Sequence, residues 1–169
     1  DENDNIYFAN NEGLIQYDGT VWSKYILPNK SVVRSLKTGK SGKIYVGGYN
    51  EFGYFIPNKN GRLVYFSISK FLNKQTIPSI DIIWKIHLYK DEVIFQSFDK
   101  AYVYKNKSLK ILKAPTRFQF SFTVASKLYF QEVSKGLMEY RNGSLFLLPN
   151  TSALNNTEVW GIFKLSSTQ

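Results

Sequence analysis

The stretch IYFANNEGLIQYDG, residues 6–19, decides the fold because it holds two short apolar runs and a turn signal in succession. The runs Ile6–Phe8 and Leu14–Tyr17 have the length and the aromatic and β-branched content of short strands. The dipeptide Asp18-Gly19 that follows supplies the positive φ angles of a tight hairpin. The stretch therefore predicts two antiparallel strands and a turn that leads into a third.

The same pattern occurs three more times along the chain. Runs of apolar, aromatic and apolar residues begin at Ile6, Ile44, Val93 and Leu128, at spacings of 38, 49 and 35 residues. Each run is followed by a second short strand, a turn, a third strand, and a fourth strand that opens the next unit. Units of four short strands, repeated every 35–50 residues or so, are typical of propeller blades. We therefore expect an all-β fold, a β-propeller fragment of about four four-stranded antiparallel blades.

The predicted organisation is one partial propeller over residues 1–169. With strands lettered A to D from the inside of a blade outwards, we expect strands B–D of a first blade at 5–25, blades at about 31–66, 81–112 and 119–148, and strand A of a further blade at 158–165. One alternative is a ring of four blades that the last strand closes. We favour an excerpt of a longer propeller, because the final residues resemble an interrupted blade.

Composition limits the classes of function. The chain has no cysteine, which excludes a disulfide framework, a cysteine-ligated zinc and a cysteine nucleophile. The formal net charge of +9 comes from 18 Lys and only 4 Arg, spread along the chain. Because arginine is the usual reader of phosphates and base edges, we expect this domain to contact no nucleic acid.

Residues 6–19 resemble the two-component regulator propeller repeat, with its short strand, small-residue turn, Gly13-Leu14, aromatic residue and Asp18-Gly19. The stretch Val46–Phe55 resembles a branch of that family found in Bacteroidetes. There the propeller precedes a triple-tyrosine β-sandwich domain, a membrane helix, and a histidine kinase or a LuxR-type DNA-binding domain. The resemblance covers essentially the whole chain, although the unit at 92–112 lacks both Gly-Leu and Asp-Gly and is supported by spacing alone.

The resemblance implies a periplasmic sensor domain of an inner-membrane regulator that responds to a glycan or another nutrient signal. The implied partners are the remaining blades and the downstream sandwich domain of the parent chain, and a second copy of the parent in a homodimer. Kinase or DNA-binding activity is implied for the parent alone. A structural or dimerising scaffold without a small-molecule site is the alternative.

The sequence offers few ingredients for catalysis. His87 is the only histidine, whereas a catalytic triad or a zinc site needs further partners; we expect it at the rim, after a strand A. The carboxylates of Glu51 and of Asp91-Glu92 have no evident paired partner for acid–base work. We therefore expect no catalytic residue, metal or cofactor here, and a propeller glycosidase or lyase is the least favoured interpretation.

Aromatic and polar residues give the better indication of function. Four residues fall at equivalent positions of the predicted A strands, which line the central channel of a propeller, and three more fall on loops of one face. Flat rings stack on the apolar face of a sugar, while amides and carboxylates bind its hydroxyls. Alternatively, the two tryptophans only fill space between blades. The predicted ligand site comprises Arg34, Trp84, Phe122, Trp160, Tyr49, Asn50 and Glu51.

Overall fold

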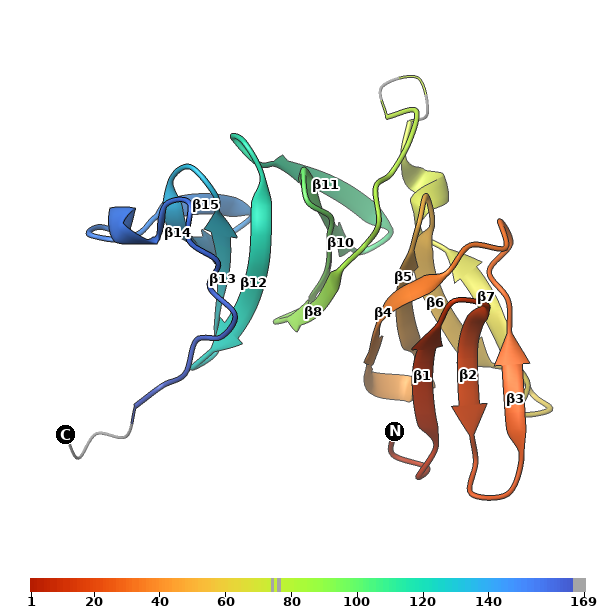
Figure 1. The fold of residues 1–169 in the computed structure, drawn as a ribbon. Coiled ribbons are helices and arrows are strands. Elements are labelled where there is room, and N and C mark those ends of the chain that lie inside the picture. The colour runs from red at the N-terminus through yellow and green to blue at the C-terminus, as the bar shows by residue number, and fades with distance from the viewer. Residues whose placement is uncertain (74, 76, 166–169) are drawn as a thin grey trace.

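The computed structural model describes residues 1–73, 75 and 77–165 (Figure 1). Over these residues the chain forms strands and three short 3-10 turns, at Lys40–Gly42, Ser69–Phe71 and Ser152–Leu154. The strands make four antiparallel sheets, each built from strands that are consecutive in sequence. The predicted all-β repeat of antiparallel units is confirmed.

The first two sheets lie in the N-terminal half. The first has three strands: β1 (Ile6–Asn10), β2 (Gly13–Tyr17) and β3 (Trp22–Tyr25). The second has four strands: β4 (Val33–Thr38), β5 (Ile44–Gly48), β6 (Phe52–Pro57) and β7 (Leu63–Ser67).

The third and fourth sheets have four strands each. The third comprises β8 (Lys85–Tyr89), β9 (Glu92–Gln96), β10 (Lys100–Lys105) and β11 (Ser108–Lys113). The fourth comprises β12 (Phe118–Val124), β13 (Lys127–Glu132), β14 (Gly136–Arg141) and β15 (Ser144–Leu147).

Tight turns fix the register of these hairpins. Asn142 and Gly143 have φ angles of 48° and 78°, so β14 and β15 are joined through two residues in the left-handed region. Asn106 and Lys107, with φ of 49° and 62°, make the corresponding turn between β10 and β11 without a glycine. Because two-residue hairpin turns of this hand match the twist of the strands, they hold consecutive strands in pairs.

The core lies between the sheets. Along β9 and β10, residues that alternate in sequence point to opposite faces. Phe95 and Tyr102 pack toward the second sheet in a cluster with Tyr45 and Phe52, whereas Ile94 packs toward the fourth sheet, in a cluster with Phe118, Leu128, Phe130 and Tyr140. A further cluster, around Leu14, Val46 and Phe55, joins the first and second sheets. Each sheet is therefore buried against its neighbours in sequence.

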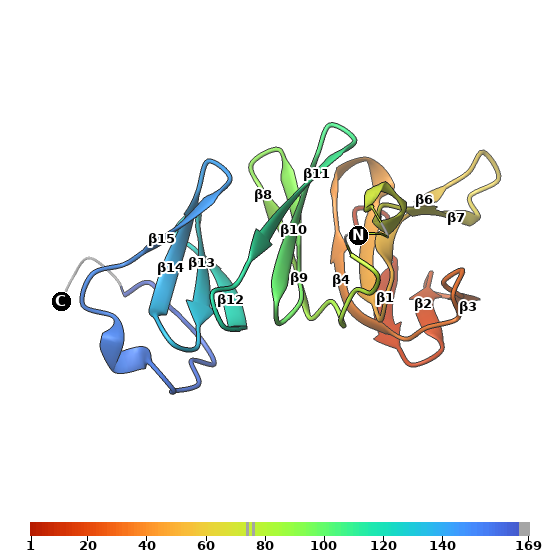
Figure 2. The ribbon, with the colours of Figure 1, turned by 90° about the horizontal axis from the view of Figure 1, so that it is seen from above.

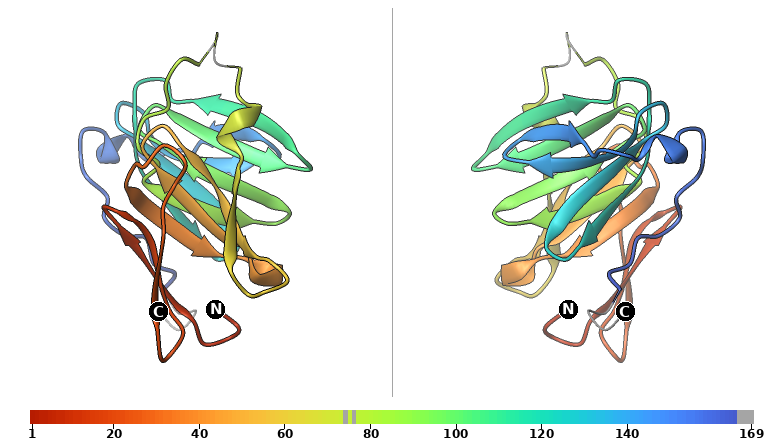
Figure 3. Two further views of the ribbon diagram at one scale, coloured as in Figure 1. Left: turned by 90° about the vertical axis from the view of Figure 1, so that its right-hand side faces the viewer. Right: turned by 90° about the vertical axis from the view of Figure 1, so that its left-hand side faces the viewer.

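The four sheets follow one another like the leaves of a fan (Figure 2). Seen from either end, they lie one behind another (Figure 3). In each sheet the first strand in sequence, β1, β4, β8 or β12, is an end strand of the sheet. Contacts join β1 to β4, β4 to β8 and β8 to β12. These four strands form the inner side of the arc, which is where a shared site can be built.

The innermost strand of the third sheet starts later than expected. The sequence predicts a strand at 82–86, whereas β8 begins at Lys85. The reason is tertiary: the N–H of Ile83 donates to the carbonyl of Gly48 at 3.0 Å, and its carbonyl accepts a bond of 2.7 Å from the Ser35 hydroxyl. The backbone at Ile83 thus bonds to the second sheet before the chain joins its own.

Residues 158–165 form no strand in the structure, although the sequence analysis expects a strand A there. A strand exists as such only when a neighbour completes its ladder of hydrogen bonds. Within the described part of the chain, no strand follows to provide that ladder. The side chains of Trp160 and Phe163 are accordingly 75% and 86% exposed.

Candidate functional site

A cavity of about 560 Å³ lies on the inner side of the arc. It falls within the range of about 300–1,000 Å³ typical of small-molecule sites. Its lining comes from β1, β4, β8 and β12, and from Trp84, the residue just before β8. We call it the inner cavity; its lining residues are Ala9, Arg34, Ser35, Leu36, Lys37, Trp84, Lys85, Ile86, His87, Ser121, Phe122 and Thr123.

His87 lies in the wall of this cavity, inside β8, and not at the rim where the sequence analysis expects it. Its Nδ1 lies 3.0 Å from Oγ1 of Thr123, and its Nε2 lies 2.6 Å from Oγ of Ser121. The Ser121 hydroxyl in turn donates to Oε1 of the fully buried Gln96. The imidazole therefore ties β8 to β12 across the cavity wall.

The charge state of His87 follows from its surroundings. Burial, and then the positive charges of Lys85 and Lys37, lower the pKa of His87 from 6.5 to about 4. A buried imidazole loses hydration that favours its charged form, and nearby cations oppose protonation. At neutral pH the ring is therefore uncharged, and it can act as one donor and one acceptor toward the two hydroxyls.

Three cationic side chains line the inner cavity: Arg34, Lys37 and Lys85. Arg34 donates from one guanidinium nitrogen to Oδ1 of Asn11 at 2.7 Å, an uncharged partner. None of the ion pairs found in the described part of the chain includes any of these three cations. The lining contains no carboxylate, so the cavity carries unbalanced positive charge.

Aromatic rings form another part of the same wall. Trp84 and Phe122 both line the inner cavity, and the ring of Phe98 lies 5.2 Å from that of Trp84. The Nε1 of Trp84 is buried and finds no hydrogen-bond partner among the described residues. A buried donor without a partner costs free energy.

Asn50 and Glu51 lie elsewhere, in a second cavity of about 310 Å³ on the loop face. Oε1 of Glu51 accepts bonds from the N–H of Phe52 at 2.9 Å and from the hydroxyls of Tyr65, Ser67 and Ser69 at 3.1, 2.9 and 2.6 Å. Burial, followed by the charge of Glu51, raises the pKa of Tyr65, which therefore stays a donor. Glu51 thus fastens the start of β6 to the end of β7.

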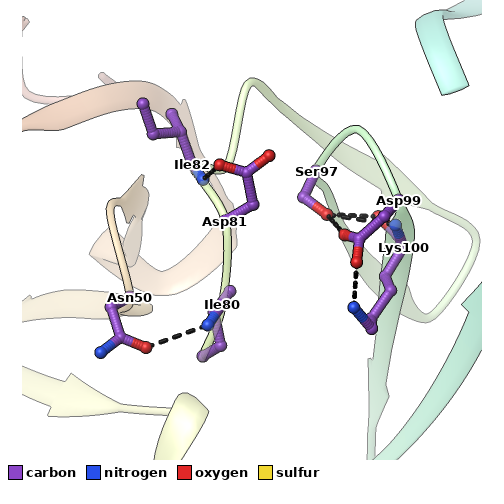
Figure 4. A network of polar contacts seen from close by, with 7 residues as sticks. All are labelled: Asn50, Ile80, Asp81, Ile82, Ser97, Asp99 and Lys100. Atoms are coloured by element: carbon purple, nitrogen blue, oxygen red, sulfur yellow. Dashed lines mark hydrogen bonds and ion pairs between the residues drawn. The ribbon is translucent and has the colours of Figure 1, made fainter. Parts of the chain in front are cut away.

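The neighbouring polar contacts are also internal to the fold (Figure 4). Oδ1 of Asn50 accepts the N–H of Ile80 at 3.0 Å, which holds the crossover toward β8. Ser97 donates to Asp99 at 2.7 Å, and Asp99 pairs with Lys100. These groups fix loops, and their hydrogen-bonding capacity is largely used within the chain.

The structure thus divides the predicted site. Arg34, Trp84 and Phe122 come together at the inner cavity, whereas Asn50 and Glu51 lie in the second cavity. Tyr49 is 53% exposed and Trp160 is 75% exposed, and neither lines the inner cavity; the Trp160 ring lies 5.0 Å from that of Phe120. Trp160 leaves the set because residues 158–165 form no strand in the structure.

Sequence reasoning missed six polar residues of the inner cavity. The predicted strands could have indicated them, because each lies within three positions of a predicted residue, on the inner strand at that point of the chain. The missed residues are Ser35, Lys37, Lys85, His87, Ser121 and Thr123.

Within the part of the chain that the structure describes, no group of three or more His, Cys, Asp or Glu side chains could hold a metal ion. Over the same residues, no helix has the length and apolar character required to span a bilayer.

No family model matches the chain, and no curated protein matches it. Solved structures do. The extracellular domain of a putative hybrid two-component system from B. thetaiotaomicron matches with a TM-score of 0.62 at 17% identity, over 90% of this chain and 21% of that chain. A streptogramin B lyase matches with a TM-score of 0.60 at 16% identity, over 90% of this chain and 54% of that chain.

The fold of this chain is that of a β-propeller. A catalytically inactive variant of virginiamycin B lyase from Staphylococcus aureus, solved with quinupristin, matches with a TM-score of 0.60 at 16% identity, over 84% of this chain and 50% of that chain. The propeller described here spans about half the length of the lyases and about a fifth of the sensor domain. At these identities the similarity concerns the fold.

Proposed function

We propose that this propeller is the ligand-binding sensor domain of a membrane-bound regulator of the two-component type. It lies in the periplasm in this proposal, and it responds to a glycan or another nutrient-derived molecule. One observation carries the proposal: the inner strands bring Trp84 and Phe122 into one cavity with Arg34 and the hydroxyls of Ser121 and Thr123. Rings that stack on a sugar and groups that bind its hydroxyls are thus combined in one place.

The fold is similar to the extracellular domain of a hybrid two-component system and also to streptogramin-type lyases, so the choice between sensing and catalysis rests on the site. The lining of the inner cavity holds no carboxylate that could pair with His87, which favours binding over acid–base catalysis. In the proposed mechanism, a ligand that bridges β4, β8 and β12 favours one arrangement of the blades and of the downstream sandwich domain. That preference biases the output of the parent, a homodimer in this proposal.

Calorimetric titration with a panel of short oligosaccharides, neutral and charged, tests the proposed function. Trp84→Ala and Phe122→Ala are expected to weaken binding about tenfold each, since each removes a stacking surface. The matched control is Trp160→Ala, which deletes a tryptophan outside the inner cavity and should leave affinity unchanged. If no member of the panel binds, or if Trp160→Ala has the same effect as Trp84→Ala, the inner cavity is not a sugar site.

A scaffold role is the second candidate, and exposed apolar side chains on the first sheet favour it. Ile6, Phe8 and Trp22 are 52%, 46% and 60% exposed, and the rings of Phe8 and Trp22 lie 5.7 Å apart. β1 is also an end strand, whose outer edge pairs with no strand among the described residues. Sedimentation over a range of concentrations distinguishes this role: a dimer that Trp22→Lys dissociates would support it, and a monomer throughout would count against it.

A further inference from the structure

The inner cavity is cationic as well as aromatic, and this property narrows the ligand class of the proposed function, on which the inference rests. Arg34, Lys37 and Lys85 reach it from β4 and β8. All three are exposed to solvent, and none is neutralised by an ion pair within the described chain. Four lysines elsewhere in the described chain form ion pairs: Lys24, Lys100, Lys105 and Lys127.

Like charges in one cavity repel one another, whereas a bound anion is attracted by all three cations. Lys85 and Lys37 already act on the cavity wall, because together with burial they hold the pKa of His87 down. The hydroxyl protons of Ser121 and Thr123 are already used, by Gln96 and by His87, so the three cations alone carry the preference for an anion.

We propose that the inner cavity binds an anionic sugar, a short oligosaccharide that carries carboxylate or sulfate groups. The anionic group lies among Arg34, Lys37 and Lys85, and a sugar ring lies against Trp84 or Phe122. Arginine and lysine make charge-assisted hydrogen bonds to such groups, which are stronger than bonds between neutral partners. The cavity of about 560 Å³ is in the range of sites for ligands of this size.

The test compares a sugar with its neutral form. The probes are a trimer of galacturonic acid and its fully methyl-esterified form, which share a backbone and differ in charge, and a sulfated and an unsulfated disaccharide. Titrations are run at low ionic strength with the whole chain. We expect the acid or the sulfated sugar to bind at least about tenfold tighter than its neutral counterpart. Which of the two pairs shows this difference identifies carboxylate or sulfate as the recognised group.

Variants assign the effect to the cavity. Lys85→Gln and Arg34→Gln should each weaken the charged probe about tenfold or more and leave the neutral one nearly unchanged. Lys59→Gln is the matched control, because Lys59 is exposed at the β6–β7 turn, away from the inner cavity, and its loss changes the net charge equally. An equal loss in all three variants would mean general attraction by the net charge, and would overturn the proposal.

His87 supplies a readout that does not depend on affinity. It is the only histidine, so its imidazole gives one set of NMR signals. Burial is the first cause of its lowered pKa, followed by the charges of Lys85 on its own strand and Lys37 on β4. Uncharged hydroxyls of Ser121 and Thr123 face it from β12. A bound anion should raise the pKa of His87 by about one unit, and the neutral ester should not.

The outcomes separate the two proposals. If the neutral ester binds as tightly as the acid and Trp84→Ala weakens both, the sugar site stands and its anionic preference is refuted. If the acid binds while the pKa of His87 does not move, the anion lies outside the inner cavity and the inference is wrong. If no probe of any charge binds, the proposed sensor function itself fails.

Discussion

At the scale of single residues, two buried tyrosines have opposite environments. Tyr102 and Tyr140 are both fully buried. The hydroxyl of Tyr140 donates to Oε2 of Glu92 at 2.7 Å, whereas that of Tyr102 has no hydrogen-bond partner among the described residues. Burial of a hydroxyl costs free energy that only a hydrogen bond offsets. Removal of the hydroxyl should therefore change the stability of the protein in opposite directions at these two tyrosines.

We expect Tyr102→Phe to raise the free energy of unfolding by about 1 kcal/mol, because it removes an unpaired polar group. Tyr140→Phe should lower it by about 1.5–3 kcal/mol, because it takes a donor away from a carboxylate. Urea denaturation of the two variants measures both changes. Equal losses in the two would contradict the hydrogen-bond assignment.

His87 should make stability depend on pH. The unfolded chain binds a proton at His87 with a pKa near 6.5, and the folded chain only near 4. Between these values the unfolded state holds more protons, so acid favours unfolding. Stability should fall as pH drops from about 6.5 to about 4, by up to about 3 kcal/mol from this group, and this loss should level off below that window.

The measurement is urea denaturation of the wild type and of His87→Gln across that pH window. Carboxylates also titrate near its lower end, so the difference between the two proteins isolates the histidine. The difference should narrow with falling pH, since only the wild type loses stability through His87. A constant difference would show that His87 has an ordinary pKa in the folded protein.

At the scale of elements, strand periodicity explains both the success and the limits of prediction from sequence. Apolar and aromatic runs followed by Asp18-Gly19 or Asn142-Gly143 predicted the β2–β3 and β14–β15 hairpins, because those signals are local. The start of β8 was not predictable in that way. Ile83 looks like a strand residue but bonds to Gly48 and Ser35 of another sheet, and only the tertiary structure contains that competition.

Substitutions at two adjacent residues of β9 should weaken two different interfaces between sheets. Phe95→Ala removes a ring that packs 4.6 Å from that of Phe52, between the second and third sheets. Ile94→Ala opens a cavity between the third and fourth sheets. Each should lower the free energy of unfolding by about 2–5 kcal/mol.

Hydrogen exchange locates these two effects. Phe95→Ala should speed exchange chiefly in β5 and β6, and Ile94→Ala chiefly in β13 and β14, because each sheet packs on its neighbours alone. The same exchange pattern in both variants would mean that β9 does not face two separate cores.

At the scale of the whole molecule, the arc of sheets brings distant residues together. Arg34 and Phe122 are far apart in sequence, and they meet because each stands on the inner strand of its sheet. The repeat predicted that these two residues lie close to the same cavity, since equivalent positions of successive blades lie at the same distance from the propeller axis. It could not predict that Trp160 would lie outside, or that His87 would lie inside, because those placements depend on whether residue 160 joins a strand and on where β8 begins.

The central claim is that inner strands of successive sheets lie side by side around one cavity. Proton NMR of the unliganded chain tests it directly, because the single imidazole of His87 gives isolated ring signals. The account predicts nuclear Overhauser contacts from that ring to the methyl group of Thr123 and the β-protons of Ser121, across from β8 to β12. A ring with contacts to its own sheet and none to β12 would contradict it.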